Sequence, residues 1–412
     1  MADGADAGAD AGVDAGVDAG ADASAQTFDE ARLLEEACSR TGLDDFGDEG
    51  FREPLGRLLR SLRDEAPLNE LGRATFRQRL LESLECRLTT QYWITKHPEI
   101  LDEEIGGPLV VVGLMRTGTT MLQRMLASDP RHHAAMWWET RFPAPPPGVD
   151  WNAPDPRIAP AEAEVAAILE ADPRQASIHP WDALAPDEEI LLLEHSFLSH
   201  VPESFTYVPG YRDWLDEQDW TPAYRHLETQ LKFLQWQKRQ RGTVRERWVL
   251  KTPGHLGYLD TLFEVFPEAR VIQTHRDPLE TIPSSASMNH SLWALYGDVE
   301  GDNRAGPQVR DRLAWAMQRC LETRARMPAD RFCDVWFRDA LEDPMGEIAR
   351  AYALFGIELT PAAKAAIEAW RAAHPRDRRP PHEYTMADYG LTPESIESAF
   401  AEYRARFIAP RA

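Results

Sequence analysis

The feature that most constrains the fold is a short apolar run, GGPLVVVGLM, at residues 106–115. Its four central apolar residues, 109–112, show no polar alternation, which is typical of a strand buried on both faces of a parallel sheet. The next segment, TTMLQRMLASDP at 119–130, has the apolar spacing of a helix. A buried strand that leads directly into a helix favours an α/β fold.

The same pairing recurs later in the chain. We expect helices at 255–266, 306–327 and 344–356, and strands in RWVLK at 247–251, ARVIQTHR at 269–276 and FCDVWF at 332–337. Strands that alternate with helices imply a mostly parallel sheet flanked by helices and joined by right-handed crossovers. A binding site is then expected at the carboxyl ends of the strands.

Three regions differ in composition. Residues 1–26 repeat Asp with Ala and Gly and offer almost nothing to bury, so we expect a disordered acidic tail. Residues 27–104 have helical periodicity and predict a helical N-terminal region. Residues 105–412 are expected to form the α/β domain, with a helical insertion at about 141–245 that begins in a proline-rich stretch and covers the pocket.

Charge and composition argue against nucleic acid and membrane partners, secretion, disulfides and structural zinc. The net charge of -23 opposes binding to nucleic acid or to an anionic membrane surface. The chain has no apolar run near 18 residues and no secretory signal pattern, so we expect no membrane span and a cytoplasmic protein. The four cysteines are far apart and form no C-x-x-C pair, which argues against disulfides and structural zinc. The sequence leaves open whether the chain forms a homodimer.

A phosphate-binding loop is predicted between the first strand and its helix, in GLMRTGTT at 113–120. Backbone N–H groups and the positive end of the helix dipole would point there toward a bound anion. The spacing is that of a P-loop, except that Thr119 stands where nucleoside triphosphatases carry the lysine that reaches the β- and γ-phosphates. The loop therefore favours an anion smaller than a triphosphate tail. An ordinary glycine-rich turn is the structural alternative.

The loop resembles the 5′-phosphosulfate-binding loop of sulfotransferases, in the branch with arginine that includes tyrosylprotein and bacterial sulfotransferases. The resemblance implies 3′-phosphoadenosine 5′-phosphosulfate (PAPS) as the sulfuryl donor, adenosine 3′,5′-bisphosphate as the product, and no required metal. The residues that it places on the 5′-phosphosulfate are Arg116, Thr117, Gly118, Thr119 and Thr120.

A second motif follows the strand at 269–276. Arg276 ends that strand and Ser284 follows eight residues later, a spacing that resembles the 3′-phosphate-binding element of sulfotransferases. Near the carboxyl end, Arg378 and Arg379 lie in a basic segment similar to the loop that closes over the 3′-phosphate in that family. The alternative for Arg276 is a structural salt bridge, and the alternative for the basic segment is a charged surface loop.

The resemblance also suggests a general base and a cation. Glu139 in MWWETRFP is similar to the proposed base of tyrosylprotein sulfotransferases, although its spacing from the loop is longer here. Trp137 and Trp138 would exclude water and raise its pKa. Lys251 ends a buried strand and suits a cation that neutralises the bridging oxygen as it leaves.

Two other candidates for the base remain. His255 follows Lys251 by four residues, but Pro253 holds the position that carries the histidine in one sulfotransferase branch, so His255 is also a candidate helix cap. Residues 187–189, Asp-Glu-Glu, start a predicted helix and would either contact the acceptor or complement the helix dipole.

The sequence thus predicts an enzyme that transfers a sulfuryl group from PAPS to a hydroxyl or amine by in-line displacement with a general base. The tryptophans at 137, 138 and 181 suggest a small aromatic or apolar acceptor. The alternatives are a P-loop small-molecule kinase, which would need magnesium, and a non-catalytic nucleotide-binding module.

Overall fold

The sheet is the centre of the molecule. The computed structural model describes residues 27–171, 173, 179–299, 301–375 and 385–411. Within these residues, five parallel strands form one sheet in the order β2-β3-β1-β4-β5. The strands are β1 (Leu109–Gly113), β2 (His132–His133), β3 (Arg247–Lys251), β4 (Arg270–His275) and β5 (Phe332–Trp336). The predicted α/β fold with a mostly parallel sheet is confirmed.

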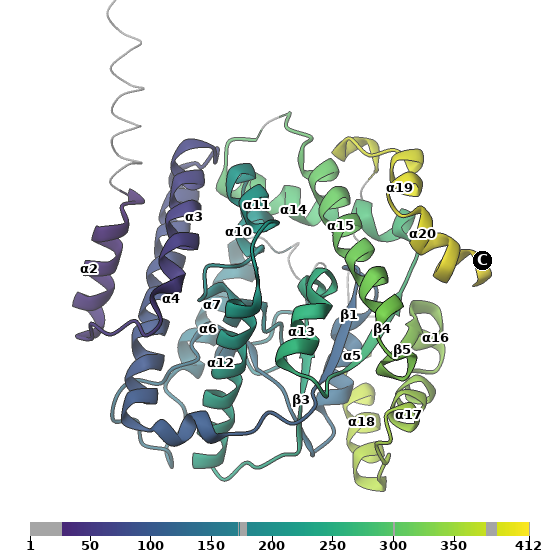
Figure 1. Cartoon of the computed structure of the whole chain (residues 1–412), viewed down its shortest axis with the longest axis horizontal. Coiled ribbons are helices and arrows are strands. Elements are labelled where there is room, and N and C mark those ends of the chain that lie inside the picture. The colour runs from purple at the N-terminus through teal and green to yellow at the C-terminus, as the bar shows by residue number, and fades with distance from the viewer. Residues whose placement is uncertain (1–26, 172, 174–178, 300, 376–384, 412) are drawn as a thin grey trace, which may run out of the picture.

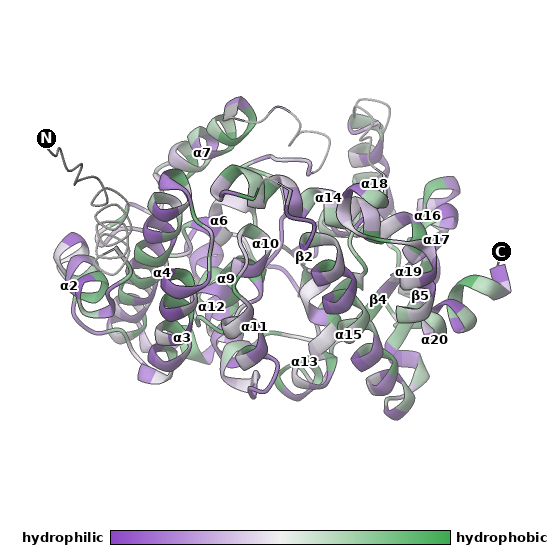
Figure 2. Cartoon of the chain, turned by 90° about the horizontal axis from the view of Figure 1, so that it is seen from above, coloured by the Kyte–Doolittle hydropathy of each residue, from purple (hydrophilic) through white to green (hydrophobic). Residues whose placement is uncertain are grey.

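Helices cover both faces of this sheet, and further helices lie beyond its two edges. In chain order they are α2 (Glu30–Thr41), α3 (Arg52–Asp64), α4 (Glu70–Lys96), α5 (Thr119–Ala127), α6 (Trp137–Arg141), α7 (Ile158–Ala171), α9 (Ile190–Glu194), α10 (Val201–Phe205), α11 (Pro209–Leu215), α12 (Thr221–Gln240), α13 (Leu259–Val265), α14 (Pro278–Tyr296), α15 (Ala305–Arg326), α16 (Phe337–Glu342), α17 (Pro344–Leu354), α18 (Pro361–Ala373), α19 (Pro393–Ala399) and α20 (Ala401–Tyr403). Figures 1 and 2 show α2–α4 at one end of the molecule and α16–α20 at the other. No helix among the described residues combines the length and the apolar character needed to cross a membrane.

The central strands are buried on both faces, which explains their continuous apolar sequence. Every residue of β1 is buried. Val110 and Val112 belong to the larger hydrophobic cluster, which also contains buried residues of α12, α13, α14 and α15. Leu109 and Val111 face the other way, into a cluster with α5, α17 and α18. Alternate residues of one strand therefore bind the two helical layers to the sheet.

The register brings the ends of the three inner strands to one edge. Val111 of β1 lies opposite Lys251 of β3, and Gly113 lies opposite Thr274 of β4. Residues that immediately follow β1, β3 and β4 are therefore neighbours, although they are far apart in sequence. This is the edge at which the sequence predicted the site.

Local structure departs from the sequence prediction at two points. The edge strand β2 has only two residues, too few for a periodic pattern, and the sequence did not indicate it. The helix expected at 255–266 is divided into a 3-10 turn at Pro253–Tyr258, capped by Thr252, and the short helix α13. Trp315 lies within 2.5 Å of the place where a Cβ on Gly257 would stand, so this turn packs tightly on α15.

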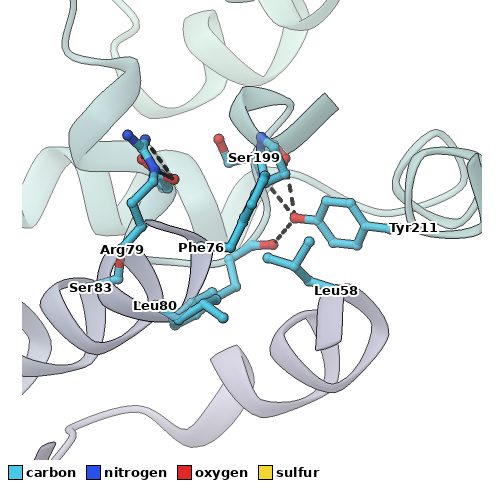
Figure 3. A pocket seen from close by; sticks show the side chains of 10 residues that line it. Leu58, Phe76, Arg79, Leu80, Ser83, Ser199 and Tyr211 are labelled. Carbon is cyan, nitrogen blue, oxygen red and sulfur yellow. Dashed lines mark hydrogen bonds and ion pairs between the residues drawn. The ribbon is translucent and has the colours of Figure 1, made fainter. Parts of the chain in front are cut away.

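The N-terminal helices share the large hydrophobic cluster with the sheet rather than forming a separate core. Figure 3 shows their seam with the segment between α9 and α11, around a cavity of about 10 Å³. Arg79 of α4 binds both carboxylate oxygens of Glu194 there, at 2.9 and 2.7 Å from its Nη2. The Tyr211 hydroxyl donates to the carbonyl of Phe197, whose φ of 58° is rare for an aromatic residue, and lies 3.1 Å from the carbonyl of Ser199.

The substitution Tyr211→Phe tests this seam. It removes the hydroxyl and leaves two buried carbonyls without this donor, which is expected to lower the free energy of unfolding by about 1–3 kcal/mol. Urea unfolding, followed by circular dichroism, measures the change. The matched control is Tyr92→Phe, which removes a hydroxyl that accepts an exposed hydrogen bond from Lys96, so a change below about 0.5 kcal/mol is expected. Equal changes in the two variants would show that Tyr211 does not hold the seam.

Candidate active site

The loop after β1 has the backbone of an anion cradle. Arg116 and Gly118 have positive φ values of 69° and 88°, and α5 begins directly after Gly118. The Thr117 hydroxyl donates to the carbonyl of Leu114 at 2.6 Å and lies 2.6 Å from the Thr274 hydroxyl of β4. A left-handed conformation at a long residue such as Arg116 is costly and is most often retained at functional sites.

Gly113 is required by the close approach of β4 to this loop. A Cβ at Gly113 would lie 2.1 Å from the Thr274 hydroxyl oxygen and 2.9 Å from the Thr274 carbonyl oxygen. The Thr274 hydroxyl donates in turn to the carbonyl of Val112 at 3.2 Å. The first glycine of the motif therefore lets the two inner strands close on the loop and fix its shape.

Arg276 joins the two predicted phosphate motifs. Its Nη1 donates to the carbonyl of Arg116 at 3.0 Å, and its Nε and Nη2 donate to Glu280 at 2.9 and 2.7 Å. The guanidinium lies 4.3 Å from the ring centroid of Phe337, which also packs 3.2 Å from the place of a Cβ on Gly118. Phe337 directly follows β5 and was not indicated by the sequence as part of the site.

Ser284 is less closely associated with Arg276. It lies on α14, which starts at Pro278 and is capped by Asp277. The Ser284 side chain is buried, and within the described residues no hydrogen bond joins it to Arg276. Its role at a 3′-phosphate remains a prediction. Arg378 and Arg379 lie outside the described residues.

Lys251 forms a buried ion pair at the end of β3. Its side chain has no exposed surface, and its Nζ donates to Glu188 at 2.6 Å. The other Glu188 oxygen accepts from the Thr252 hydroxyl at 3.0 Å. Glu188 is 25% exposed, so its carboxylate faces both the lysine and solvent.

The helix of the phosphate loop holds the segment that carries Glu188. Buried Gln123 of α5 donates from its side chain to the carbonyl of Asp187 at 2.8 Å. Arg124, the next residue of α5, donates to the carbonyls of Pro186 at 3.1 Å and Pro180 at 2.8 Å. The predicted anion cradle and the Glu188–Lys251 pair are therefore fixed to one helix.

Asp187 strengthens this segment. Its carboxylate accepts from the Glu188 backbone N–H at 2.7 Å and contacts His179 Nε2 at 2.7 Å. Burial opposes its ionisation, but the charge and hydrogen bond of His179, together with Lys251, hold the pKa of the Asp187 carboxyl below its ordinary value. Asp187 is therefore hydrogen-bonded into the segment beside Lys251, and a contact between the acidic triplet and an acceptor stays a prediction.

His255 is enclosed by two partners. It has no exposed surface; its Nε2 lies 2.7 Å from Glu189 and its Nδ1 lies 2.7 Å from the Tyr224 hydroxyl. Burial, and then the charge of Glu189, raise the pKa of Tyr224 well above its ordinary value. Glu189 also accepts from the Lys251 backbone N–H at 2.9 Å. Both ring nitrogens of His255 are thus engaged in holding the end of β3.

Glu139 lies on the opposite face of β3 from Lys251. One of its oxygens accepts from the Met136 backbone N–H at 2.9 Å, and the other pairs with Lys238 of α12. Lys238 lies over the ring of Trp248, whose side chain faces α12. Because side chains alternate along a strand, Lys251, three residues after Trp248, faces the other way. The structure therefore brings Glu188, and not Glu139, to Lys251.

The sequence and the fold of this chain are similar to those of known proteins. Residues 108–361 match the sequence profile described as "Sulfotransferase family". The structure is similar to sulfotransferase STF1 from Mycobacterium tuberculosis, with a TM-score of 0.80 and 33% identity over 91% of this chain and 98% of that one. Sulfotransferase STF9 from Mycobacterium avium gives a TM-score of 0.82 and 30% identity, over 92% and 96% of the two chains.

A curated relative is also similar in sequence. It is omega-hydroxy-beta-dihydromenaquinone-9 sulfotransferase Stf3 from Mycobacterium bovis, with 28% identity over 258 residues. The match spans 61% of this chain and 63% of that relative. From the profile match and the two solved structures, the chain belongs to the sulfotransferase family.

Proposed function

We propose that the protein transfers a sulfuryl group from PAPS to a hydroxyl or amine of a small molecule. The observation that carries the proposal is the hydrogen bond from Arg276 to the Arg116 carbonyl, since it places the two predicted phosphate motifs side by side. PAPS carries a phosphate on the 3′ oxygen of its ribose and a phosphosulfate on the 5′ oxygen, and this arrangement offers a cradle for the 5′-phosphosulfate and a cation for the 3′-phosphate.

The residues present fit such a donor better than they fit a nucleoside triphosphate. Thr119 stands at the first position of α5, where a kinase P-loop would carry its lysine. Lys251 comes from β3 instead, and the register places it level with Val111, two residues before the loop. A cation there can neutralise the single oxygen that leaves sulfur.

In the proposed reaction, Glu188 takes the proton of the acceptor. A bond forms between the acceptor oxygen or nitrogen and sulfur, and the bond between sulfur and the bridging phosphate oxygen breaks. The bisphosphate leaves with the electron pair, beside Lys251. Glu188 suits the role of base because its side chain is 25% exposed, whereas the side chains of Glu189 and Glu139 are 1% and 4% exposed.

The acceptor is proposed to be small and largely apolar. Trp137 of α6 and Trp181 pack edge to face, with ring centroids 4.9 Å apart, on the segment that leads to Glu188. The curated relative Stf3 is named for omega-hydroxy-beta-dihydromenaquinone-9. An apolar molecule that presents a hydroxyl group to Glu188 is consistent with both observations.

Thermal unfolding in the presence of nucleotides tests the donor. Adenosine 3′,5′-bisphosphate without magnesium, at a hundredfold excess over its Kd, is expected to stabilise the protein by about 2.7 kcal/mol. Each kcal/mol corresponds to a rise in Tm of about 1 °C for a chain of this size, because the entropy of unfolding grows with chain length. ATP with magnesium is the comparison. Stabilisation by ATP with magnesium, without stabilisation by the bisphosphate, would instead indicate a kinase.

The substitution Arg276→Ala tests the 3′-phosphate position. Loss of a charge-assisted hydrogen bond is expected to weaken binding of adenosine 3′,5′-bisphosphate by about 10- to 100-fold. Binding of adenosine 5′-monophosphate should change much less, because that ligand has no 3′-phosphate. Calorimetry measures both affinities, and Arg225→Ala on the exposed side of α12 is the control. An equal loss of affinity for the two ligands would show that Arg276 contacts a part of the nucleotide other than the 3′-phosphate.

The substitutions Glu188→Gln and Glu139→Gln compare the two candidate bases. Glu188→Gln is expected to lower kcat by about 10²- to 10⁴-fold while binding of the bisphosphate is retained. Glu139→Gln weakens the pair with Lys238 and should act on stability more than on kcat. Labelled PAPS and an acceptor found by screening phenols, quinols, sterols and lipids provide the assay. A large loss of kcat in Glu139→Gln alone would return the role to Glu139.

A further inference from the structure

A basic cavity lies on the α12 side of the sheet, beside the edge strand β2. Its volume is about 220 Å³. The charged and titratable residues that line it are His133, Glu139, Arg157, Lys238, Arg241 and Arg245. Four cations therefore face one carboxylate, in a protein whose net charge is -23.

Two of these cations are neutralised within the protein. Lys238 pairs with Glu139, and Arg157 makes a two-point pair with Asp155 at 2.8 and 2.7 Å. Arg157 also donates to Gln237 and to two backbone carbonyls, so its donors are fully used. These two residues give the cavity rigid walls.

The other two cations keep unused donors. Arg241 donates from Nη1 to two carbonyls and from Nη2 to Asp155 at 3.1 Å, but its buried Nε has no hydrogen-bond partner within the described part of the chain. Arg245 donates from Nη1 to the His132 carbonyl, and it forms no ion pair with any described residue. Arg241 shares the single carboxylate of Asp155 with Arg157, and Arg245 is only partly buried. An anion from solution can therefore add charge-assisted hydrogen bonds to both guanidinium groups.

His133 lies in the positive electrostatic potential of these cations. Burial, and then the charges of Lys238 and Arg245, lower the pKa of His133 to about 3. The imidazole is therefore neutral at ordinary pH and can offer one N–H group to a ligand. Its ring packs on Trp248, with centroids 5.2 Å apart, which fixes its orientation toward the cavity.

The cavity also has an apolar part. Met136 and Trp138 line it, and Arg157 lies 4.7 Å from the ring centroid of Trp138. A dry cavity of about 150 Å³ holds a benzene molecule, so a volume of about 220 Å³ leaves room for a ring and a charged substituent. We propose that this cavity binds a small organic anion, with its carboxylate on Arg245 and Arg241 and its aromatic or apolar body against Met136 and Trp138.

This site is separate from the proposed donor and acceptor site. Arg245 precedes Lys251 by six residues, which corresponds to roughly 20 Å of extended chain. Lys238, which lines the cavity, lies over Trp248 on the α12 face of β3, whereas Lys251 faces α5. A ligand in the cavity would therefore occupy neither the anion cradle nor the space beside Glu188.

Calorimetry with benzoate on the full chain tests the proposal, with neutral benzamide as the matched ligand. Benzoate, with roughly nine non-hydrogen atoms, is expected to bind with a Kd on the order of 1 mM or tighter. Benzamide should bind at least tenfold more weakly, because it carries no charge for Arg245 and Arg241. Equal affinities for the two ligands, or no binding of benzoate, would overturn the proposal.

Three variants and one competition experiment locate the bound benzoate. Arg245→Gln should weaken binding at least tenfold and Arg245→Lys by less, whereas the control Arg225→Gln, which removes an exposed charge of α12, should leave it unchanged within twofold. Thermal unfolding checks that each variant is folded, and the comparison of benzoate with benzamide on the unaltered chain does not depend on the variants. Saturation with adenosine 3′,5′-bisphosphate should also leave the benzoate affinity unchanged. Displacement by the bisphosphate, or full binding by Arg245→Gln, would contradict a separate site.

Discussion

The contact between β1 and β4 at Gly113 and Thr274 is the constraint on which the site depends. Because Gly113 has no side chain, the Thr274 hydroxyl can reach both Thr117 and the carbonyl of Val112. That contact fixes a loop whose backbone is held in the left-handed region at Arg116 and Gly118. The strain is local, and the buried parallel strands on either side supply the packing that maintains it.

The alternation of side chains along β3 then determines which charged groups lie close to one another. Residues of β3 that face α12 pack with Lys238 and Glu139, and residues that face α5 pack near Glu188. Two carboxylates that flank the same strand thus belong to different environments. The first is part of a basic cavity, and the second is held beside a buried lysine next to the anion cradle.

The sequence indicated the fold well and the site only in part. Apolar runs predicted β1, β3, β4 and β5, because their burial on both faces is recorded in the local sequence. The loop and Arg276 were also predicted, since each directly follows a strand. The partner of Lys251 was not singled out, because the order of strands and the face on which Glu188 and Glu139 lie are set by long-range packing. Phe337 carries no motif at all, and only the structure places it against Arg276.

The hydrogen bonds from Gln123 and Arg124 to the chain at 180–187 make α5 a shared support for both halves of the reaction. Gln123 and Arg124 lie in the second turn of this helix, and their hydrogen bonds set the separation between the proposed cradle and the carboxylate of Glu188. A substitution beyond this anchored stretch can then alter the surroundings of the acceptor without changing the separation between the proposed cradle and Glu188.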